Sequence, residues 1–399
     1  PVMFGECHLE IWDGGARKIQ TTFSAQAYHD HNVGALPVFR EFHSWYWGKV
    51  VCDYCTFVYY YVPAKNEQQL LQWACIFEKK SNSMEKQSLT SLLQITHPVI
   101  MAPMFLVSNT KMVIEGMKSG VAGCIPALNY RTLEELKASI HELKAAKVPG
   151  GSFGYNLIVN KSNVKYKEQL RILCEERVDF ILTSLGSPEE TIREAHKVGI
   201  KVFCDVTDLA FAKKVESLGA DALIAVNNQA GGHRGNIDPE TLIKQLNENT
   251  KLPVISAGGV SKKSDLDSML SYGAVGVSVG SPFIASNEAG VSQEYKQACV
   301  DYGAKDIVMT ERISGTPCTV INTPYVQKVG TKQSWIETLL NKNKSLKKWV
   351  KMIRFYIGMK ATEKAATQVT YKTVWVAGPS IENTTAILPI KDIVKKIVF

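Results

Sequence analysis

The sequence lacks the features of a membrane-spanning or secreted protein. Its 399 residues contain no uncharged apolar run of about 18 or more, so no segment is expected to cross a bilayer. Residues 1–20 show no basic stretch followed by an apolar one, so no secretory signal is expected either. The nine cysteines are scattered and odd in number, which predicts reduced thiols in the cytoplasm rather than a disulfide framework.

The chain also has little excess charge and few of the short motifs that identify a ligand. Its 46 basic and 38 acidic residues give a net charge of +8 without a basic patch interleaved with aromatics, so nucleic acid is not expected as a partner. No Walker loop, no G-x-G-x-x-G after a strand and no close His, Asp or Glu cluster for a metal is present. The modest positive charge fits an anionic cofactor or substrate.

Composition divides the chain near residue 84. Residues 1–83 hold 16 of the 36 aromatic residues and four of the nine cysteines. An apolar run at 50–62 indicates a strand. Cys52 and Cys55 have the spacing of half a zinc site, but without a second pair we interpret them as plain thiols. We interpret 1–83 as an atypical N-terminal extension, and whether it belongs to the native product stays open.

From Met84 onward, short apolar runs alternate with amphipathic stretches. The eight runs are 95–102, 121–125, 152–156, 179–183, 201–205, 222–226, 253–256 and 275–279. The helix-like stretches include 132–146, 165–176, 188–197, 209–218, 240–247 and 263–270. Continuously apolar runs are typical of a parallel sheet covered on both faces. The pattern predicts an α/β fold, a (β/α)₈ TIM barrel over 84–330, with a doubly wound open sheet as the alternative.

A small helical C-terminal subdomain, 331–399, is expected to pack on the barrel. Residues 335–364 are basic with an apolar stripe. Such a helix either lies on a membrane surface or, as we favour, packs on the barrel with its lysines in solvent. A last helix is predicted at 390–398. The sequence does not indicate which oligomeric state the protein adopts.

Two glycine-rich turns follow the seventh and eighth predicted strands. The first contains Gly258 and Gly259, and the second contains Gly280 and Ser281. In a (β/α)₈ barrel these two loops form the usual phosphate site, because their backbone amides point at the anion and glycine lets it approach. The simpler interpretation is that the glycines only make tight turns, but two such turns at these two strands favour phosphate binding.

A histidine follows the sixth predicted strand, in the segment Ala230, Gly231, Gly232, His233 and Arg234. Catalytic groups of such barrels lie at the carboxyl ends of the strands, which places His233 at the mouth. A neutral imidazole there can take a proton from carbon near neutral pH. The backbone at 230–232 can approach a flat or anionic ligand, whereas Arg234 either binds phosphate or substrate or lies exposed in the loop.

Two further strand ends reach the same mouth. Ala102, Pro103 and Met104 follow the first strand, and Asn156 ends the third. Their backbone and amide groups could contact a heterocycle, although Asn156 could instead satisfy loop backbone groups. Asp205, at the end of the fifth strand, is the one carboxylate that we place at the mouth.

Taken together, these segments resemble the nitronate monooxygenase family, formerly called 2-nitropropane dioxygenases. The motifs that carry the resemblance are the segment 102–104, the strand end at 156, AGGHRG at 230–235, SAGGV at 256–260, VGSPF at 279–283, SGTP at 314–317 and TYKTVWVAGPSIE at 370–382. The resemblance covers essentially 84–399 and none of 1–83. It implies a barrel that binds FMN non-covalently, with the phosphate on the two glycine turns, the ring beside the other segments, and His233 as the catalytic base.

The reaction implied by the resemblance is oxidative denitrification of an alkyl nitronate, or of a neutral nitroalkane, by O₂ to a carbonyl compound and nitrite. His233 is needed only for neutral nitroalkanes, whose α-proton must first be removed. Two alternatives stay open. One is an FMN-dependent enoyl-[acyl-carrier-protein] reductase using NAD(P)H, which resembles the family in barrel, FMN and a similar AGGH segment. The other is a non-catalytic barrel that binds FMN or another phosphate ligand.

Overall fold

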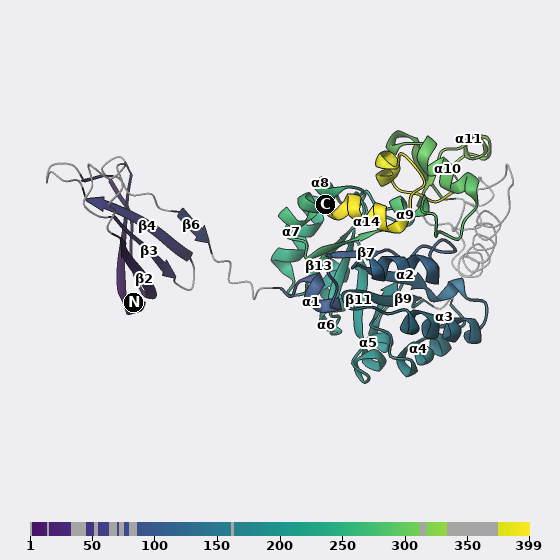
Figure 1. Ribbon diagram of the computed structural model, residues 1–399, viewed down its shortest axis with the longest axis horizontal. Helices are drawn as coiled ribbons and strands as arrows, with labels where there is room; N and C mark the ends of the chain where they lie inside the picture. Colours follow the sequence, from purple (N-terminus) through teal and green to yellow (C-terminus); the bar gives the residue numbers. More distant parts are fainter. Residues whose placement is uncertain are drawn as a thin grey trace. The chain divides into compact units, whose positions relative to one another are not determined.

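The structure is a computed structural model with two compact units, Pro1–Glu85 and Lys86–Phe399 (Figure 1). It describes residues 2–13, 16–32, 45–51, 55–63, 70–71, 76–79, 86–160, 163–311, 317–332 and 374–399. Several predicted features lie outside these residues, namely Cys52, the helix at 335–364, residues 314–316 of the SGTP motif and residues 370–373.

The N-terminal unit is an antiparallel sheet. Its strands are β1 (Val2–Asp13), β2 (Ala16–Asn32), β3 (Trp45–Val51), β4 (Cys55–Pro63) and β5 (Leu70–Leu71) in that order, with β6 (Ile76–Lys79) also paired to β4. The prediction of one continuous strand over 50–62 is wrong, because this run contains the end of β3 and most of β4. These two strands pair antiparallel, with Val51 opposite Thr56. The sequence is apolar on both sides of the reversal, so periodicity alone did not reveal it.

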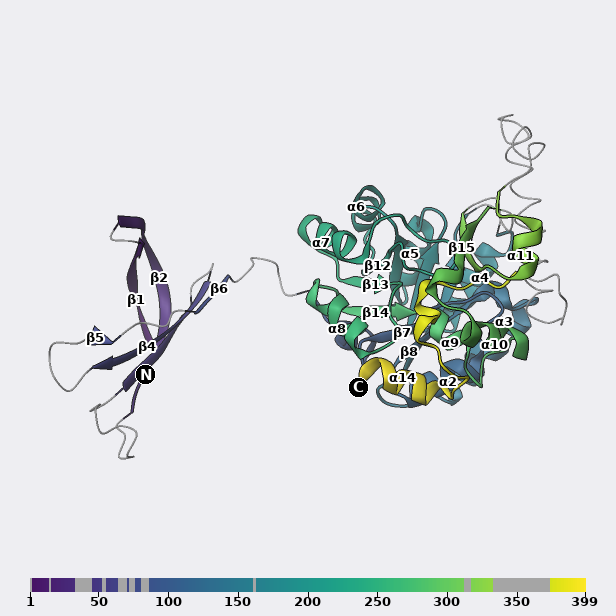
Figure 2. The same cartoon turned by 90° about the horizontal axis from the view of Figure 1, so that it is seen from above.

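Eight parallel strands of the C-terminal unit close into a barrel (Figures 1 and 2). They are β7 (Val99–Met101), β8 (Ala122–Pro126), β9 (Ser152–Ile158), β10 (Phe180–Ser184), β11 (Lys201–Val206), β12 (Ala222–Val226), β13 (Val254–Ala257) and β14 (Gly276–Val279). Each strand pairs with the next, and β14 pairs with β7. The predicted (β/α)₈ barrel is confirmed, and β13 and β14 lie across its mouth from β9 and β10.

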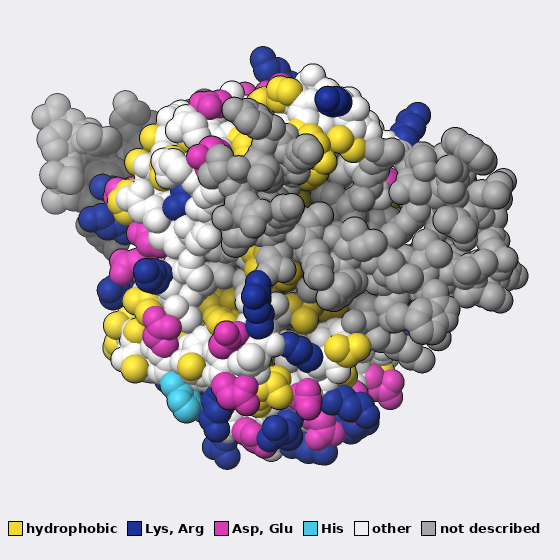
Figure 3. All heavy atoms as spheres, turned by 90° about the vertical axis from the view of Figure 1, so that its right-hand side faces the viewer, with side chains coloured by type: hydrophobic (Ala, Val, Ile, Leu, Met, Phe, Trp, Pro, Cys, Tyr) yellow, Lys and Arg dark blue, Asp and Glu magenta, His cyan; other side chains and the backbone are white. Residues whose placement is uncertain are grey.

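Helices cover the outside of the barrel (Figure 1). They are α2 (Thr110–Lys118), α3 (Leu133–Ala145), α4 (Tyr166–Glu175), α5 (Glu189–His196), α6 (Leu209–Ser217), α7 (Pro239–Asn249) and α8 (Lys263–Ser271). Local sequence explains their ends. Thr132 and Glu135 form a reciprocal cap at the start of α3, and Gly199 and Gly219 take positive φ just after α5 and α6. On the face drawn in Figure 3, acidic and basic side chains are interspersed among the described residues.

The barrel interior is apolar below the mouth and polar at it. The short helix α1 (Leu89–Leu93) packs its leucines against inward-facing side chains such as Phe180 and Phe203. Successive inward positions on a strand are two residues apart. On β10 the inward residues after Phe180 are therefore Leu182 and then Ser184, and on β11 Asp205 follows Phe203.

Further elements follow the barrel and end beside it. They are α9 (Ser281–Ile284), α10 (Gln293–Asp301), the antiparallel strands β15 (Ile307–Thr310) and β16 (Cys318–Ile321), α11 (Pro324–Val329), a 3₁₀ turn (Pro379–Asn383) and α14 (Ile390–Val398). The β15–β16 pair was not predicted, whereas α14 has the predicted bounds and contacts α2 and α8. None of the helices in the described ranges is long and apolar enough to cross a membrane.

Candidate active site

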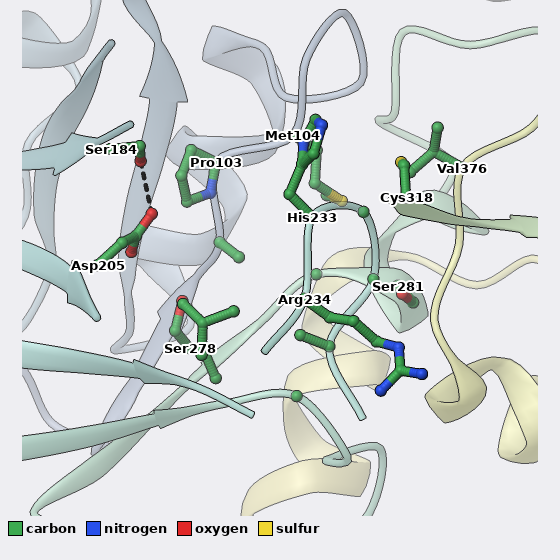
Figure 4. A pocket seen from close by; sticks show the side chains of 18 of the residues that line it. Pro103, Met104, Ser184, Asp205, His233, Arg234, Ser278, Ser281, Cys318 and Val376 are labelled. Carbon is green, nitrogen blue, oxygen red and sulfur yellow. Dashed lines mark hydrogen bonds between the residues drawn. The ribbon is translucent and has the colours of Figure 1, made fainter. Parts of the chain in front are cut away.

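A cavity of about 740 Å³ opens at the carboxyl ends of the barrel strands (Figure 4). Every residue proposed from the sequence for catalysis or cofactor binding lines it, namely Ala102, Pro103, Met104, Asn156, Ala230, Gly231, Gly232, His233, Gly258, Gly259, Gly280 and Ser281. Asp205 and Arg234 also line it. The barrel thus brings together strand ends that are far apart in the sequence.

One side of the cavity presents unpaired backbone donors. Over the described residues, the amides of Gly259, Val260, Gly280 and Ser281 donate to no protein acceptor. Gly258 and Gly259 have φ of 111° and 83°, a backbone conformation that favours glycine. Unpaired amides on two adjacent loops fit an anion such as phosphate.

The glycines of this side also let backbone segments touch. A Cβ on Gly258 would lie 2.4 Å from the amide nitrogen of Ala230, so the loops after β12 and β13 lie directly together. A Cβ on Gly231 would lie 2.8 Å from Oγ of Ser281 and 2.9 Å from the amide nitrogen of Gly378. These glycines therefore have a further role besides making tight turns and leaving room for a ligand. They also allow neighbouring backbone segments of the protein to pack closely.

His233 projects from the loop after β12 into the cavity (Figure 4). Its side chain is exposed at the cavity surface, yet protein surrounds it broadly enough that burial lowers its pKa below the usual value. The neutral imidazole therefore predominates at neutral pH and can accept a proton.

The loop that carries His233 is held by β16. Oγ1 of Thr319 accepts a hydrogen bond from the Gly232 amide at 2.8 Å, and the Thr319 amide donates to the Gly232 carbonyl at 3.0 Å. Arg234 braces the same loop, because its Nη1 donates to the carbonyls of Asn228 and Gly235. Thr319 was not predicted, because it lies in a strand pair that the periodicity of the sequence did not indicate.

The C-terminal segment reaches the cavity from another direction. The Gly378 amide donates to Oγ of Ser281 at 2.9 Å. The Tyr295 hydroxyl donates to the carbonyl of Val376 at 2.5 Å, and the Tyr295 ring stacks on Trp375. These contacts position the hydroxyl of Ser281 beside the unpaired amides.

The amides predicted to contact a heterocycle already have protein acceptors. The backbone amides of Ala102 and Met104 donate to oxygens 2.8 and 2.9 Å away. The side-chain amide of Asn156 donates to Oγ of Ser184 at 2.8 Å and to a backbone carbonyl at 3.2 Å. A ring bound on this side would therefore meet side-chain surfaces and carbonyl oxygens rather than these donors.

A polar relay crosses three neighbouring strands at the cavity floor. Asn156 on β9 donates to Ser184 on β10, and the Ser184 hydroxyl donates to Oδ2 of Asp205 on β11 at 2.5 Å (Figure 4). Burial raises the pKa of Asp205 to about 7, and the Ser184 hydrogen bond opposes this rise. Within the described ranges, no group of three or more His, Cys, Asp or Glu residues could hold a metal ion.

Comparison with known proteins finds relatives named as a dehydrogenase and a monooxygenase and a solved structure with a similar fold. A 5-hydroxy-7a-methyl-1-oxo-octahydro-1H-indene-4-carboxyl-CoA dehydrogenase of Rhodococcus jostii is 26% identical over 290 residues, 71% of this chain and 81% of that protein. A nitronate monooxygenase of Paraburkholderia phytofirmans is 32% identical over 156 residues, 37% of this chain and 43% of that protein. The solved structure of FabK from Thermotoga maritima is 26% identical, with TM-score 0.67, and the alignment covers 78% of this chain and 94% of FabK.

A sequence profile of the nitronate monooxygenase family matches residues 156–399, which is more than half of the chain. The matched part includes the Asn156 strand end, the His233 loop, both glycine turns and the C-terminal segment at the cavity. The chain therefore belongs to the nitronate monooxygenase family and is a flavin-dependent oxidoreductase.

Proposed function

We propose that this enzyme binds FMN in the cavity and oxidises alkyl nitronates with O₂ to a carbonyl compound and nitrite. One observation carries the proposal. His233, whose pKa is lowered by burial, lines the same cavity as two adjacent loops with unpaired amides. A base and an anion site in one cavity suit a phosphate-bearing cofactor and a substrate that loses a proton.

The residues of the cavity divide into phosphate and ring contacts. The amides at 259–260 and 280–281, with the Ser281 hydroxyl, would hold the FMN phosphate. Residues 102–104, Asn156 and the backbone at 230–232 would surround the ring. The bound flavin would supply the electron exchange between nitronate and O₂, which side chains cannot perform.

His233 would act before that exchange. Its neutral imidazole accepts the α-proton of a neutral nitroalkane, and a nitronate that enters already deprotonated does not need this step. The resulting imidazolium then lies in the cavity as a positive charge that stabilises the anionic nitro oxygens. Thr319 and Arg234 would keep the loop in place during the transfer.

Oxygen consumption and nitrite release test the proposal. The purified protein should release a flavin identified as FMN on denaturation. It should also consume O₂ and form nitrite with ethyl nitronate, and more slowly with nitroethane. A flavin-bound protein that produces no nitrite from either compound would contradict the assignment.

A thioester oxidoreductase is the second candidate. The Rhodococcus relative, named as a dehydrogenase of a carboxyl-CoA compound, matches over 81% of its length. Two solved structures similar to this chain are of FabK, at 26% identity. Rapid anaerobic bleaching of the flavin by NADH, together with no turnover of propionate-3-nitronate, would favour an NAD(P)H-dependent enoyl reductase.

A further inference from the structure

Asp205 has no part in the proton transfer proposed above, yet it faces the cavity. On β10 the inward side chains are Phe180 and Leu182, followed by Ser184, and on β11 Phe203 is followed by Asp205. The carboxyl group therefore lies between an apolar interior and the ligand cavity. A carboxylate in that position is poorly solvated, and its charge acts strongly on anything bound in the cavity.

The groups around Asp205 fix the carboxyl group without neutralising its charge. Ser184 donates to it at 2.5 Å and is itself bonded to Asn156. The inward residues of β12 are Ile224 and Val226, and the Cys124 thiol on β8 stays neutral because burial and Asp205 raise its pKa. Over the described residues, no lysine, arginine or histidine offsets the burial of Asp205.

The other ionisable groups of the cavity have separate roles. Arg234 directs its guanidinium to backbone carbonyls of its own loop. Burial lowers the pKa of His233, which keeps this group largely uncharged, and burial raises the pKa of Tyr295 and Cys318, which keeps both neutral. Asp205 is thus a carboxylate whose negative charge the described wall leaves without a cationic partner.

We propose that Asp205 lowers the reduction potential of the bound flavin when ionised and takes up a proton when the flavin is reduced. The inference rests on the flavin site proposed above. Two-electron reduction of the bound flavin, by the electrode in a titration or by substrate in turnover, would leave it with one more negative charge if only one proton accompanied the electrons. The ionised carboxylate of Asp205 would repel that negative charge, which makes reduction less favourable. Uptake of a solvent proton by the carboxyl group would remove the repulsion. Since the pKa of Asp205 is about 7, this coupling falls near neutral pH.

Spectroelectrochemical titration of the full-length flavin-bound protein, from acid to alkaline pH, tests the proposal. Asp205→Asn keeps the size of the side chain and removes its charge. At alkaline pH the midpoint potential of this variant should be more positive than that of the wild type, and the two should converge at acid pH. Across neutral pH, the midpoint potential of the wild type should also fall more steeply with increasing pH than that of Asp205→Asn.

Two further variants separate this role from a structural one. Ser184→Ala removes the hydrogen bond that lowers the pKa of Asp205, so the change of slope in the wild-type titration should move to higher pH. Asp208→Asn is the matched control, because Asp208 is an exposed N-cap of α6 and asparagine caps a helix as well. Its potential should equal that of the wild type at every pH.

Identical titrations of the wild type and Asp205→Asn would overturn the proposal. If Asp205→Asn fails to fold, comparison of the wild type with Ser184→Ala still tests the proposal. The proposal is contradicted if the slope of potential against pH changes at the same pH in both proteins. No nitronate enters these measurements. If the flavin potential depends on Asp205 but the enzyme does not oxidise nitronates, the proposed reaction is wrong and this inference stands. If the enzyme oxidises nitronates but the potential does not depend on Asp205, only this inference is wrong.

Discussion

The two sides of the cavity are built from different parts of the chain. At β13 and β14, glycine turns present backbone amides, whereas at β9 to β11 the wall consists of the side chains of Asn156, Ser184 and Asp205. A backbone site depends on conformation and close approach, so it is altered mainly by adding bulk. A side-chain site contains titratable groups, so a single isosteric substitution changes its charge.

The largest expected effect comes from blocking the backbone side. Gly259→Val places a branched side chain where φ is 83° and where a Cβ would lie 3.2 Å from Cβ of Gln229. Backbone strain of about 1–2 kcal/mol and the added bulk should together expel the flavin. The measurement is the ratio of flavin to protein absorbance after purification.

Gly199→Val is the matched control for this substitution. Gly199 has φ of 77° and open space around a Cβ, so the variant has similar strain far from the cavity and should keep its flavin. Full flavin occupancy in Gly259→Val would contradict the proposal that the phosphate binds on this side of the cavity.

The next effect tests the base. His233→Ala should lower turnover of neutral nitroalkanes by about 10²–10⁴-fold, the usual contribution of a general base, and should change nitronate turnover far less. The exposed His141 on α3 provides the matched control His141→Ala. Equal losses with both substrates would show that His233 binds or positions rather than accepting the proton.

A smaller effect is expected where β16 supports the His233 loop. Thr319→Val removes the acceptor of the Gly232 amide but keeps the backbone hydrogen bond between the two residues. Leaving this donor unpaired costs about 1–3 kcal/mol. We expect about 1.4 kcal/mol of this cost to appear in the transition state, which corresponds to a tenfold fall in neutral nitroalkane turnover. Thr319→Ser retains the hydroxyl and should restore the rate. If serine and valine give the same rate, the hydrogen bond does not position His233.

The pH dependence provides a finer test of the same loop. Since burial lowers the pKa of His233, the base stays deprotonated to lower pH than a free imidazole does. The acid limb of kcat/KM for a neutral nitroalkane should therefore lie below about pH 6.5, the usual histidine value. The same profile for a nitronate should lack this limb. An acid limb above that value would contradict the burial of the base.

The smallest effect is expected from removing the N-terminal unit, because the described residues that line the cavity all belong to Lys86–Phe399. Deleting residues 1–83 should leave the flavin content and the melting temperature of the barrel unchanged. The structure separates Pro1–Glu85 from Lys86–Phe399 as compact units. A truncated protein that aggregates or loses its flavin would show that the barrel needs this segment.

The barrel and most of its mouth could be predicted from local pattern. Buried strands such as β12 are continuous apolar runs, and the residues just after them, including His233, must lie at the carboxyl edge of a parallel sheet. The β15–β16 pair and the reversal between β3 and β4 escaped this reasoning, because short apolar runs do not reveal where a chain turns back.

The sequence by itself determined the α/β barrel, the glycine turns and the position of His233, since each depends on residues close together in the chain. Only the tertiary structure decided that Thr319 holds the Gly232 amide, that Gly378 meets Ser281, and that Asp205 is bonded to Ser184. These contacts join residues 21 to 97 positions apart. No periodicity encodes such distances, and they arise only when the closed barrel brings separate strand ends to one cavity.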